Sequence, residues 1–192
     1  MTSEPALEPA PRHLLHIHQV GPDEAADYAR AAAASFREAY DDGEDEANLA
    51  LHIAREFDES KLRRELEDPA VRVLAMRGPD GEWVGFVAMR ADVTGDGVSA
   101  KRPLEIVRFY LRAAWYGQGI ARPLMEAALA HARAGGHDGV WLQVWEHNAR
   151  ARRFYEKCGF VAVGISTFLF GAITERDPVY QLLFERAAAP PG

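Results

Sequence analysis

A mostly apolar segment, residues 104–111, leads into a glycine loop and then into a helical pattern. The loop reads Tyr116-Gly117-Gln118-Gly119-Ile120-Ala121-Arg122. A strand that passes through such a loop into a helix leaves backbone N–H groups unpaired, and the helix dipole directs them at an anion. The segment predicts a pyrophosphate cradle, although a tight turn without a ligand would have the same local pattern.

Two well-known phosphate loops do not fit the segment. A dinucleotide-binding loop needs a third glycine three residues after the second, where this chain has Arg122. A P-loop ends in Gly-Lys-Ser/Thr, and this chain has Gly119-Ile120-Ala121 instead. What remains is a shorter cradle in which Gly117 and Gly119 let the backbone approach a diphosphate and Arg122 adds a cation.

Length and charge exclude several classes of protein. At 192 residues, 48% of them hydrophobic, the chain is long enough for one full core. The formal net charge of -7 disfavours nucleic acid and anionic membranes as partners and suits a cationic substrate. The one cysteine, Cys158, excludes a disulfide framework, and no apolar run reaches the length of a membrane helix. We therefore expect a cytoplasmic protein that binds neither nucleic acid nor membrane.

Periodicity and turn residues predict a single α+β domain. The predicted elements follow the order β-α-α-α-β-β-β-α-β-α-β-β, with no repeat or linker between them. The predicted strands are 14–20, 71–76, 83–89, 103–111, 140–146, 160–168 and 178–184, and the predicted helices are 22–38, 48–56, 58–67, the segment from the glycine loop to 134, and 148–157. Residues 1–12 and 187–192 are predicted to be disordered tails around a domain of residues 13–186.

A second pattern lies in the predicted helix that begins at Asn148. Asn148 and Tyr155 are seven residues apart, about two helical turns, so both side chains lie on one helix face. The side-chain amide of Asn148, at the start of the helix, and the phenol of Tyr155 can then reach the same cleft. A half-buried tyrosine with its hydroxyl at the rim is the alternative, and the glycine loop nearby favours a functional role.

These two motifs together resemble the GNAT superfamily of N-acetyltransferases, which transfer acetyl from acetyl-CoA to an amine. The family's diphosphate motif is Gln/Arg-x-x-Gly-x-Gly/Ala, and Tyr116 departs from its first position. The resemblance implies a central mixed, mostly antiparallel twisted sheet of about seven strands, flanked by helices, with splayed fourth and fifth strands. Segments 141–148 and 168–171, followed by Asp177, resemble the PaiA-type spermidine acetyltransferases, but Ser166 stands where that branch often has histidine.

The resemblance also implies where acetyl-CoA binds. Its pantetheine arm would lie like a strand in the gap between the splayed strands, and its pyrophosphate would lie in the glycine loop. The implied cofactor-binding residues are Phe109, Tyr110, Leu111, Tyr116, Gly117, Gln118, Gly119, Ile120, Ala121, Arg122, Asn148 and Tyr155. Further candidates for phosphate contacts are Arg150, Arg152 and Arg153, although an arginine-rich helix face is often only solvated.

Three groups are candidates for the chemistry. The Leu111 N–H would stabilise the oxyanion. Tyr155 would act as the general acid, because a phenol with a pKa of about 10 can protonate a leaving thiolate. Glu105 would act as the base through water, unless it forms a structural ion pair with Arg108 or another cation. The seven histidines have no metal-ligand spacing with carboxylates, so we predict no metal.

The sequence thus predicts an acetyl-CoA-dependent N-acetyltransferase that acts on a primary amine of a small molecule by direct attack in a ternary complex. Polyamines are the first acceptor class to consider, because the acidic loop at residues 41–46 could attract them, although such a loop can also be merely solubilising. Acetylation of a protein amine or an aminoglycoside-type drug is one alternative, and a non-catalytic acyl-CoA sensor is another. A homodimer is left open.

Overall fold

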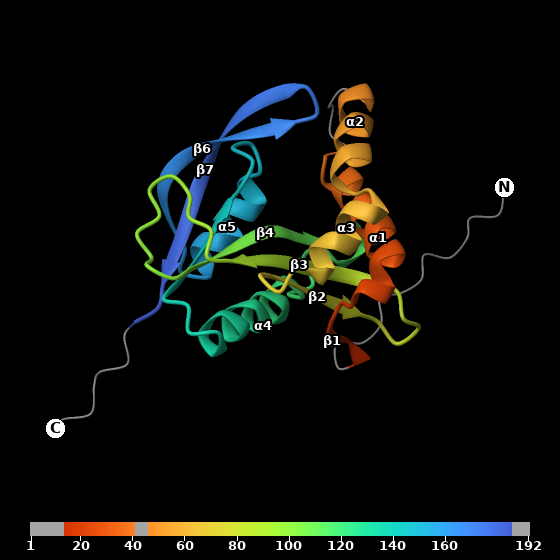
Figure 1. The fold of residues 1–192 in the computed structure, drawn as a ribbon, viewed down its shortest axis with the longest axis horizontal. Coiled ribbons are helices and arrows are strands. Elements are labelled where there is room, and N and C mark those ends of the chain that lie inside the picture. The colour runs from red at the N-terminus through yellow and green to blue at the C-terminus, as the bar shows by residue number, and fades with distance from the viewer. Residues whose placement is uncertain (1–13, 41–45, 186–192) are drawn as a thin grey trace.

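The computed structural model describes residues 14–40 and 46–185. The predicted tails and residues 41–45 of the acidic loop lie outside the described residues. The helices are α1 (Ala25–Ala39), α2 (Glu46–Glu56), α3 (Glu59–Glu67), α4 (Ala121–Ala134) and α5 (Ala149–Lys157), and the strands are β1 (His16–Gln19), β2 (Val71–Arg77), β3 (Trp83–Ala91), β4 (Pro103–Leu111), β5 (Gly139–Gln143), β6 (Val161–Phe170) and β7 (Ile173–Leu183) (Figure 1). Their order along the chain is the predicted one.

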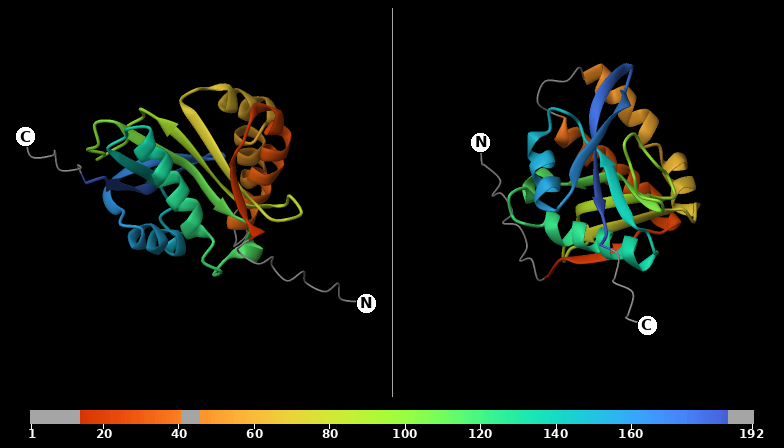
Figure 2. Two further views of the ribbon diagram at one scale, coloured as in Figure 1. Left: turned by 90° about the horizontal axis from the view of Figure 1, so that it is seen from below. Right: turned by 90° about the vertical axis from the view of Figure 1, so that its left-hand side faces the viewer.

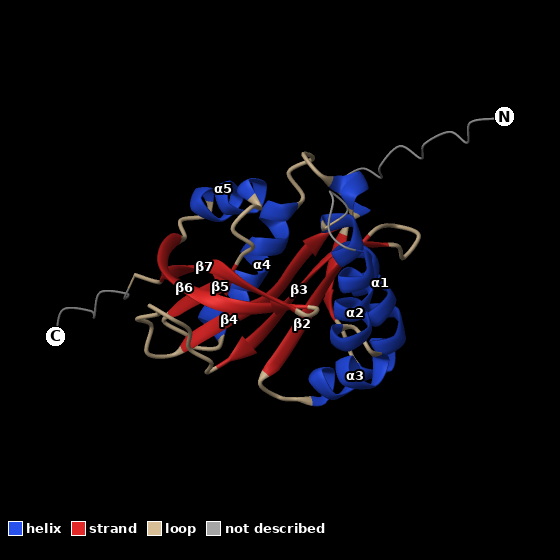
Figure 3. Ribbon diagram, turned by 90° about the horizontal axis from the view of Figure 1, so that it is seen from above, coloured by secondary structure: helices blue, strands red, loops and turns tan. Residues whose placement is uncertain are grey.

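The strands of this described part form one seven-stranded sheet in the order β1-β2-β3-β4-β5-β7-β6. Strands β4 and β5 are parallel, and the other neighbouring pairs are antiparallel. Helices α1, α2 and α3 cover one face of the sheet, and α4 and α5 cover the other (Figure 2; Figure 3). The predicted α+β class and the mixed, mostly antiparallel sheet are confirmed.

Alternating side chains build a core on each face of the sheet. On β3, Phe86 and Ala88 pack in the cluster under α1, α2 and α3, whereas Val87 and Met89 pack in the cluster under α4 and α5. Successive strand residues point to opposite faces, so a strand covered on both sides is apolar at consecutive positions. This explains the continuous apolar run that marked β3 in the sequence.

The fourth and fifth strands separate part-way along their length. Their parallel pairing runs from Pro103 with Gly139 to Ile106 with Leu142. Beyond Ile106, β4 continues to Leu111 with only β3 beside it in the sheet. The predicted splay is therefore present, and it exposes one edge of β4 to a gap.

The last hairpin differs from its prediction. The sequence suggested strands at 160–168 and 178–184, but β6 reaches Phe170 and β7 begins at Ile173. Gly171 adopts φ +56°, so the chain reverses in a tight turn and the strands pair from Phe170 with Ile173 onward. Strand β5 is shorter than predicted, since it ends at Gln143 rather than at residue 146.

Candidate active site

The open edge of β4 presents backbone groups to the gap. The Arg112 N–H donates to the Val84 carbonyl (2.9 Å), and Leu111 lies opposite Gly85 across the β3–β4 pair. In an antiparallel pair this pattern turns the N–H and C=O of Leu111 away from β3, and those of Phe109, two residues earlier, point the same way. These groups face the side on which β5 has separated, so an extended ligand can bind them as a strand would.

The glycine loop follows directly after this edge. Gly117 and Gly119 have φ +73° and +72°, a left-handed conformation that side chains other than glycine rarely adopt. A Cβ on Gly117 would meet nothing within 4 Å, so backbone conformation and not space requires glycine there. Helix α4 then starts without a side-chain cap at Ile120, which leaves its first-turn N–H groups available to an anion.

A cavity of about 590 Å³ lies between the gap and the glycine loop. The predicted cofactor-binding residues that line it are Phe109, Tyr110, Leu111, Tyr116, Gly117, Gly119, Ile120, Ala121, Arg122, Asn148 and Tyr155. The side chain of Gln118 does not line it and donates to the Ala114 carbonyl (2.8 Å), which ties the loop to the turn before it. Eleven of the twelve positions named from the sequence thus border one cavity.

Arginine and lysine side chains add positive charge to this wall. The Arg150 guanidinium, from the first turn of α5, lies 3.6 Å from the ring centroid of Tyr116. Arg153 and Lys157 of the same helix also line the cavity. Arg122 pairs with Glu126 (2.9 Å) on the surface of α4, so its charge is partly neutralised. Arg150 is therefore a cation that the structure holds against Tyr116, the first residue of the glycine loop.

Asn148 and Tyr155 both reach the cavity, as their spacing predicted. The Asn148 Oδ1 accepts the Ala151 N–H (3.0 Å) and caps α5, and its Nδ2 can still donate to a ligand. Tyr155 is buried among aromatic rings, with Phe109 edge-on to it at 6.3 Å. Burial raises the pKa of the Tyr155 hydroxyl above its usual value, with the neighbouring Tyr110 acting in the same sense. The phenol therefore stays protonated at neutral pH.

A second cavity of about 340 Å³ adjoins the first, and Glu105 lies here rather than beside the glycine loop. Tyr40, Val107, Tyr110 and Trp145 are among the residues that border both cavities. The remaining walls come from α2, the following loop and the last hairpin, through His52, Arg55, Glu56, Phe57, Phe168, Leu169 and Asp177. The two cavities therefore meet at the gap between β4 and β5.

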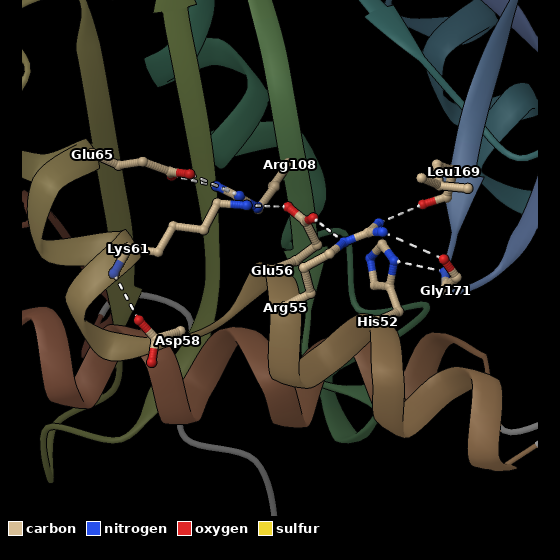
Figure 4. Close-up of polar contacts among 9 residues, drawn as sticks. All are labelled: His52, Arg55, Glu56, Asp58, Lys61, Glu65, Arg108, Leu169 and Gly171. Atoms are coloured by element: carbon tan, nitrogen blue, oxygen red, sulfur yellow. Dashed lines mark hydrogen bonds and ion pairs between the residues drawn. The ribbon is translucent and has the colours of Figure 1, made fainter.

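Glu105 is not the ion-pair partner of Arg108 that the sequence left as an alternative. Arg108 instead forms a two-pronged ion pair with Glu65 on α3, at 2.7 and 3.1 Å (Figure 4). Burial raises the pKa of the Glu105 carboxyl, and the charges of Arg90 and Arg108 oppose the shift. Six residues of strand separate Glu105 from Leu111, roughly 20 Å at 3.3 Å per residue. Glu105 therefore cannot directly contact a group bound at the Leu111 backbone.

Helix α2 holds the turn of the last hairpin against the second cavity. Arg55 donates to the carbonyls of Leu169 (3.0 Å) and Gly171 (3.4 Å), and the Gly171 N–H donates to His52 Nδ1 (3.4 Å) (Figure 4). Asn48, on the same face of α2, donates to the Phe170 carbonyl (3.0 Å). These contacts join residues more than 110 positions apart, and they close the outer wall of the second cavity.

Comparison with known proteins identifies the family. Residues 27–160 match the sequence profile of the acetyltransferase (GNAT) family. This chain belongs to the GNAT family. An uncharacterised N-acetyltransferase of Mycobacterium tuberculosis is 33% identical over 156 residues, which are 81% of this chain and 95% of that protein. The chain is therefore an acetyl-CoA-dependent N-acetyltransferase.

Two further similarities are to a solved structure and to a characterised enzyme. The crystal structure of the PaiA N-acetyltransferase from Thermoplasma acidophilum in complex with coenzyme A superimposes with a TM-score of 0.71, at 17% identity, over 88% of this chain and 99% of that one. Streptothricin acetyltransferase of Streptomyces lavendulae is 31% identical over 104 residues, 54% of this chain and 52% of that protein. At 17% identity, the similarity to the PaiA structure is one of fold.

Some residues of this GNAT site were not singled out from the sequence. His52 and Arg55 carry no local motif. Arg108 entered only as a possible ion-pair partner of Glu105, and Asp177 entered only through the PaiA-type resemblance. No group of three or more His, Cys, Asp or Glu within 14–40 and 46–185 could hold a metal ion. In that same part of the chain, no helix is long and apolar enough to cross a membrane.

Proposed function

We propose that this GNAT enzyme acetylates a primary amine of a small molecule by direct attack on acetyl-CoA in a ternary complex. The observation that carries the proposal is the junction of the two cavities at the open edge of β4. The first cavity has backbone N–H groups and cations for the acyl donor. The second has an aromatic wall and carboxylates, which favour a cationic acceptor.

The reaction then proceeds at the open edge of β4. The Leu111 N–H faces the gap and would stabilise the negative charge that develops on the thioester oxygen. The amine nitrogen forms a bond with the carbonyl carbon, the bond from that carbon to sulfur breaks, and Tyr155 protonates the leaving thiolate. Glu105, as the sequence suggested, would take up a proton through water. The buried neutral phenol and the raised pKa of the Glu105 carboxyl support these roles.

Polyamines remain the first acceptor class to test, because the second cavity combines aromatic rings with the carboxylates of Glu105 and Asp177. Streptothricin-type antibiotics form the second class. The 31% identity to streptothricin acetyltransferase over half of the chain supports them.

The experiment is an amine panel with a thiol-release readout. Acetyl-CoA is supplied with spermidine, putrescine, streptothricin, an aminoglycoside and a lysine-containing peptide. We expect release with a small amine, and initial-rate lines that intersect when both substrates are varied. Parallel lines would contradict direct transfer. Binding of CoA without release for any amine would favour the acyl-CoA sensor, and release with the peptide alone would favour a protein substrate.

A further inference from the structure

The second cavity contains a carboxylate that lies much nearer the acyl site along the strands than Glu105 does. Asp177 is on β7, is 3% exposed and lines this cavity. Its Oδ1 accepts the Glu146 N–H (3.2 Å), directly after Trp145, which borders both cavities. The carboxylate therefore sits beside the chain segment that connects the two cavities.

The strand registers give the position of Asp177 along the sheet. Gln143 pairs with Val179, and the Val144 N–H donates to the Pro178 carbonyl (3.2 Å), so Asp177 comes level with Trp145. Ile106 and Leu142 are the last pair before β4 and β5 separate, and Phe109 and Trp145 each lie three residues beyond that pair. Asp177 is thus level with the part of β4 whose backbone faces the gap.

Glu105 lies further back along the same direction. It pairs with Trp141, four residues before Trp145, which corresponds to roughly 13 Å of strand. The two carboxylates therefore border one cavity at different depths. Of the two, Asp177 is the one an amine would meet at the level of the open backbone of β4.

We propose that Asp177 receives the acceptor amine: it binds the ammonium form beside the acyl site and accepts one of its protons. This inference rests on the proposed function. The freed amine then attacks the thioester carbonyl, and a second nitrogen proton is lost as the amide forms. That proton passes through water to Glu105 and offsets the one that Tyr155 gives to the thiolate, and Asp177 returns its own proton to solvent. Glu105 thus keeps the role that the proposed function gives it, and Asp177 acts on the first proton.

The surroundings of Asp177 suit this role. Burial raises the pKa of its carboxyl, the charge of Glu146 adds to the shift, and that of His147 opposes it. Arg108 pairs with Glu65, and Arg55 pairs with Glu56. The charges of these two cations are therefore offset by carboxylates other than Asp177. The titratable or charged groups that face the same cavity are Tyr40, His52, Arg55, Glu56, Glu105, Arg108 and Tyr110.

The test measures amine kinetics of Asp177→Asn, using spermidine or whichever amine of the panel gives thiol release. For Asp177→Asn we expect kcat/KM for the amine at pH 7 to fall by about 100-fold, the scale of general base catalysis, with the KM for acetyl-CoA unchanged. Its kcat/KM should keep rising with pH up to the pKa of the free amine, because only amine deprotonated in solution would react. A purely structural role would lower activity without this change of profile.

The matched control is Asp80→Asn, the same change in the exposed turn between β2 and β3, which should behave as the unaltered enzyme. Asp177→Glu keeps a carboxylate and should keep the shape of the original pH profile. If Asp177→Asn does not fold, Asp177→Glu decides, and a profile that rises to the amine pKa in that variant overturns the inference.

Two results separate this inference from the function on which it rests. An unchanged pH profile in folded Asp177→Asn, while the unaltered enzyme releases thiol, overturns the role of Asp177 alone. Absence of thiol release by the unaltered enzyme with every amine overturns the proposed function, and the inference with it.

Discussion

At the residue scale, Tyr155 is the group for which burial has the most direct chemical consequence. Its phenol lines the acyl-donor cavity, and burial raises its pKa, so it stays protonated at neutral pH. We expect Tyr155→Phe to lower kcat by roughly 100-fold, within the range for general acid catalysis, with a small change in the KM for acetyl-CoA. Steady-state kinetics at several pH values measure this.

Tyr180→Phe is the matched control for this prediction. Tyr180 is also buried, but its hydroxyl bonds Arg152 (3.3 Å) and Glu156 (3.1 Å), outside both cavities. Loss of those bonds should lower the free energy of unfolding by about 1 kcal/mol and leave kcat unchanged. Unaltered kcat in Tyr155→Phe at every pH would remove Tyr155 from the role of general acid.

Arg150 is the second residue with a specific expected effect. Tyr116 replaces the Gln/Arg that begins the family's diphosphate motif, and the Arg150 guanidinium from α5 lies over its ring. We expect Arg150→Ala to raise the KM for acetyl-CoA about fivefold to tenfold, which is the effect expected when one exposed cation is lost. The dependence of that KM on salt should also become weaker. kcat should stay within twofold.

Arg133→Ala is the comparison for Arg150→Ala. Arg133 lies over Phe184 in the same kind of contact (4.3 Å), but in the last turn of α4, outside both cavities. Its loss should leave the KM for acetyl-CoA and the salt dependence unaltered. Equal effects of the two substitutions would show that Arg150 contributes only to the surface charge.

At the element scale, the contact between α2 and the last hairpin should decide the shape of the acceptor cavity. A Cβ on Gly171 would lie 2.1 Å from Asn48 Oδ1 and 2.7 Å from the Asn48 carbonyl oxygen, and φ there is +56°. We expect Gly171→Ala to lower the thermal midpoint and raise the amine KM at least tenfold, because α2 must move away. Acetyl-CoA binding should persist, since the glycine loop is not involved.

Gly117→Ala provides the converse result. A Cβ there meets nothing within 4 Å, so the cost is backbone strain of about 1 kcal/mol. Its effect should appear in the KM for acetyl-CoA and not in the amine KM. If Gly171→Ala raised the KM for acetyl-CoA as much as the amine KM, the two cavities would not act as separate binding sites.

The difference between these two elements explains what the sequence could predict. The donor side is made of consecutive segments, β4, the glycine loop, α4 and α5, so local spacing predicted its residues together. The acceptor side joins α2 to β4 and β7, and its contacts link residues more than 110 positions apart. No local pattern marks His52 or Arg55. The polar residues at 174–177 lack the apolar pattern of a strand, so the first half of β7 was not predicted.

At the scale of the whole molecule, the fold's stability should depend on pH through one buried imidazole. His52 is 3% exposed and lies against Phe36 and Phe170. Its Nδ1 accepts the Gly171 N–H (Figure 4). Burial lowers the pKa of His52 to about 4, opposed by the charge of Glu56. The neutral ring is thus the form that joins α2 to the hairpin.

The sign of the pH effect follows from where protons bind. Between about pH 6.5 and pH 4 the unfolded chain protonates this histidine and the folded protein does not, so the free energy of unfolding falls as pH falls through that window, by about 3 kcal/mol in total. His52→Asn keeps an acceptor at the position of Nδ1 and has no proton to bind, so its urea-unfolding free energy should change less between pH 7 and pH 4.5. His16→Gln, on exposed β1, should retain the original dependence. Equal pH dependence in His52→Asn and the unaltered protein would mean that other groups dominate acid unfolding.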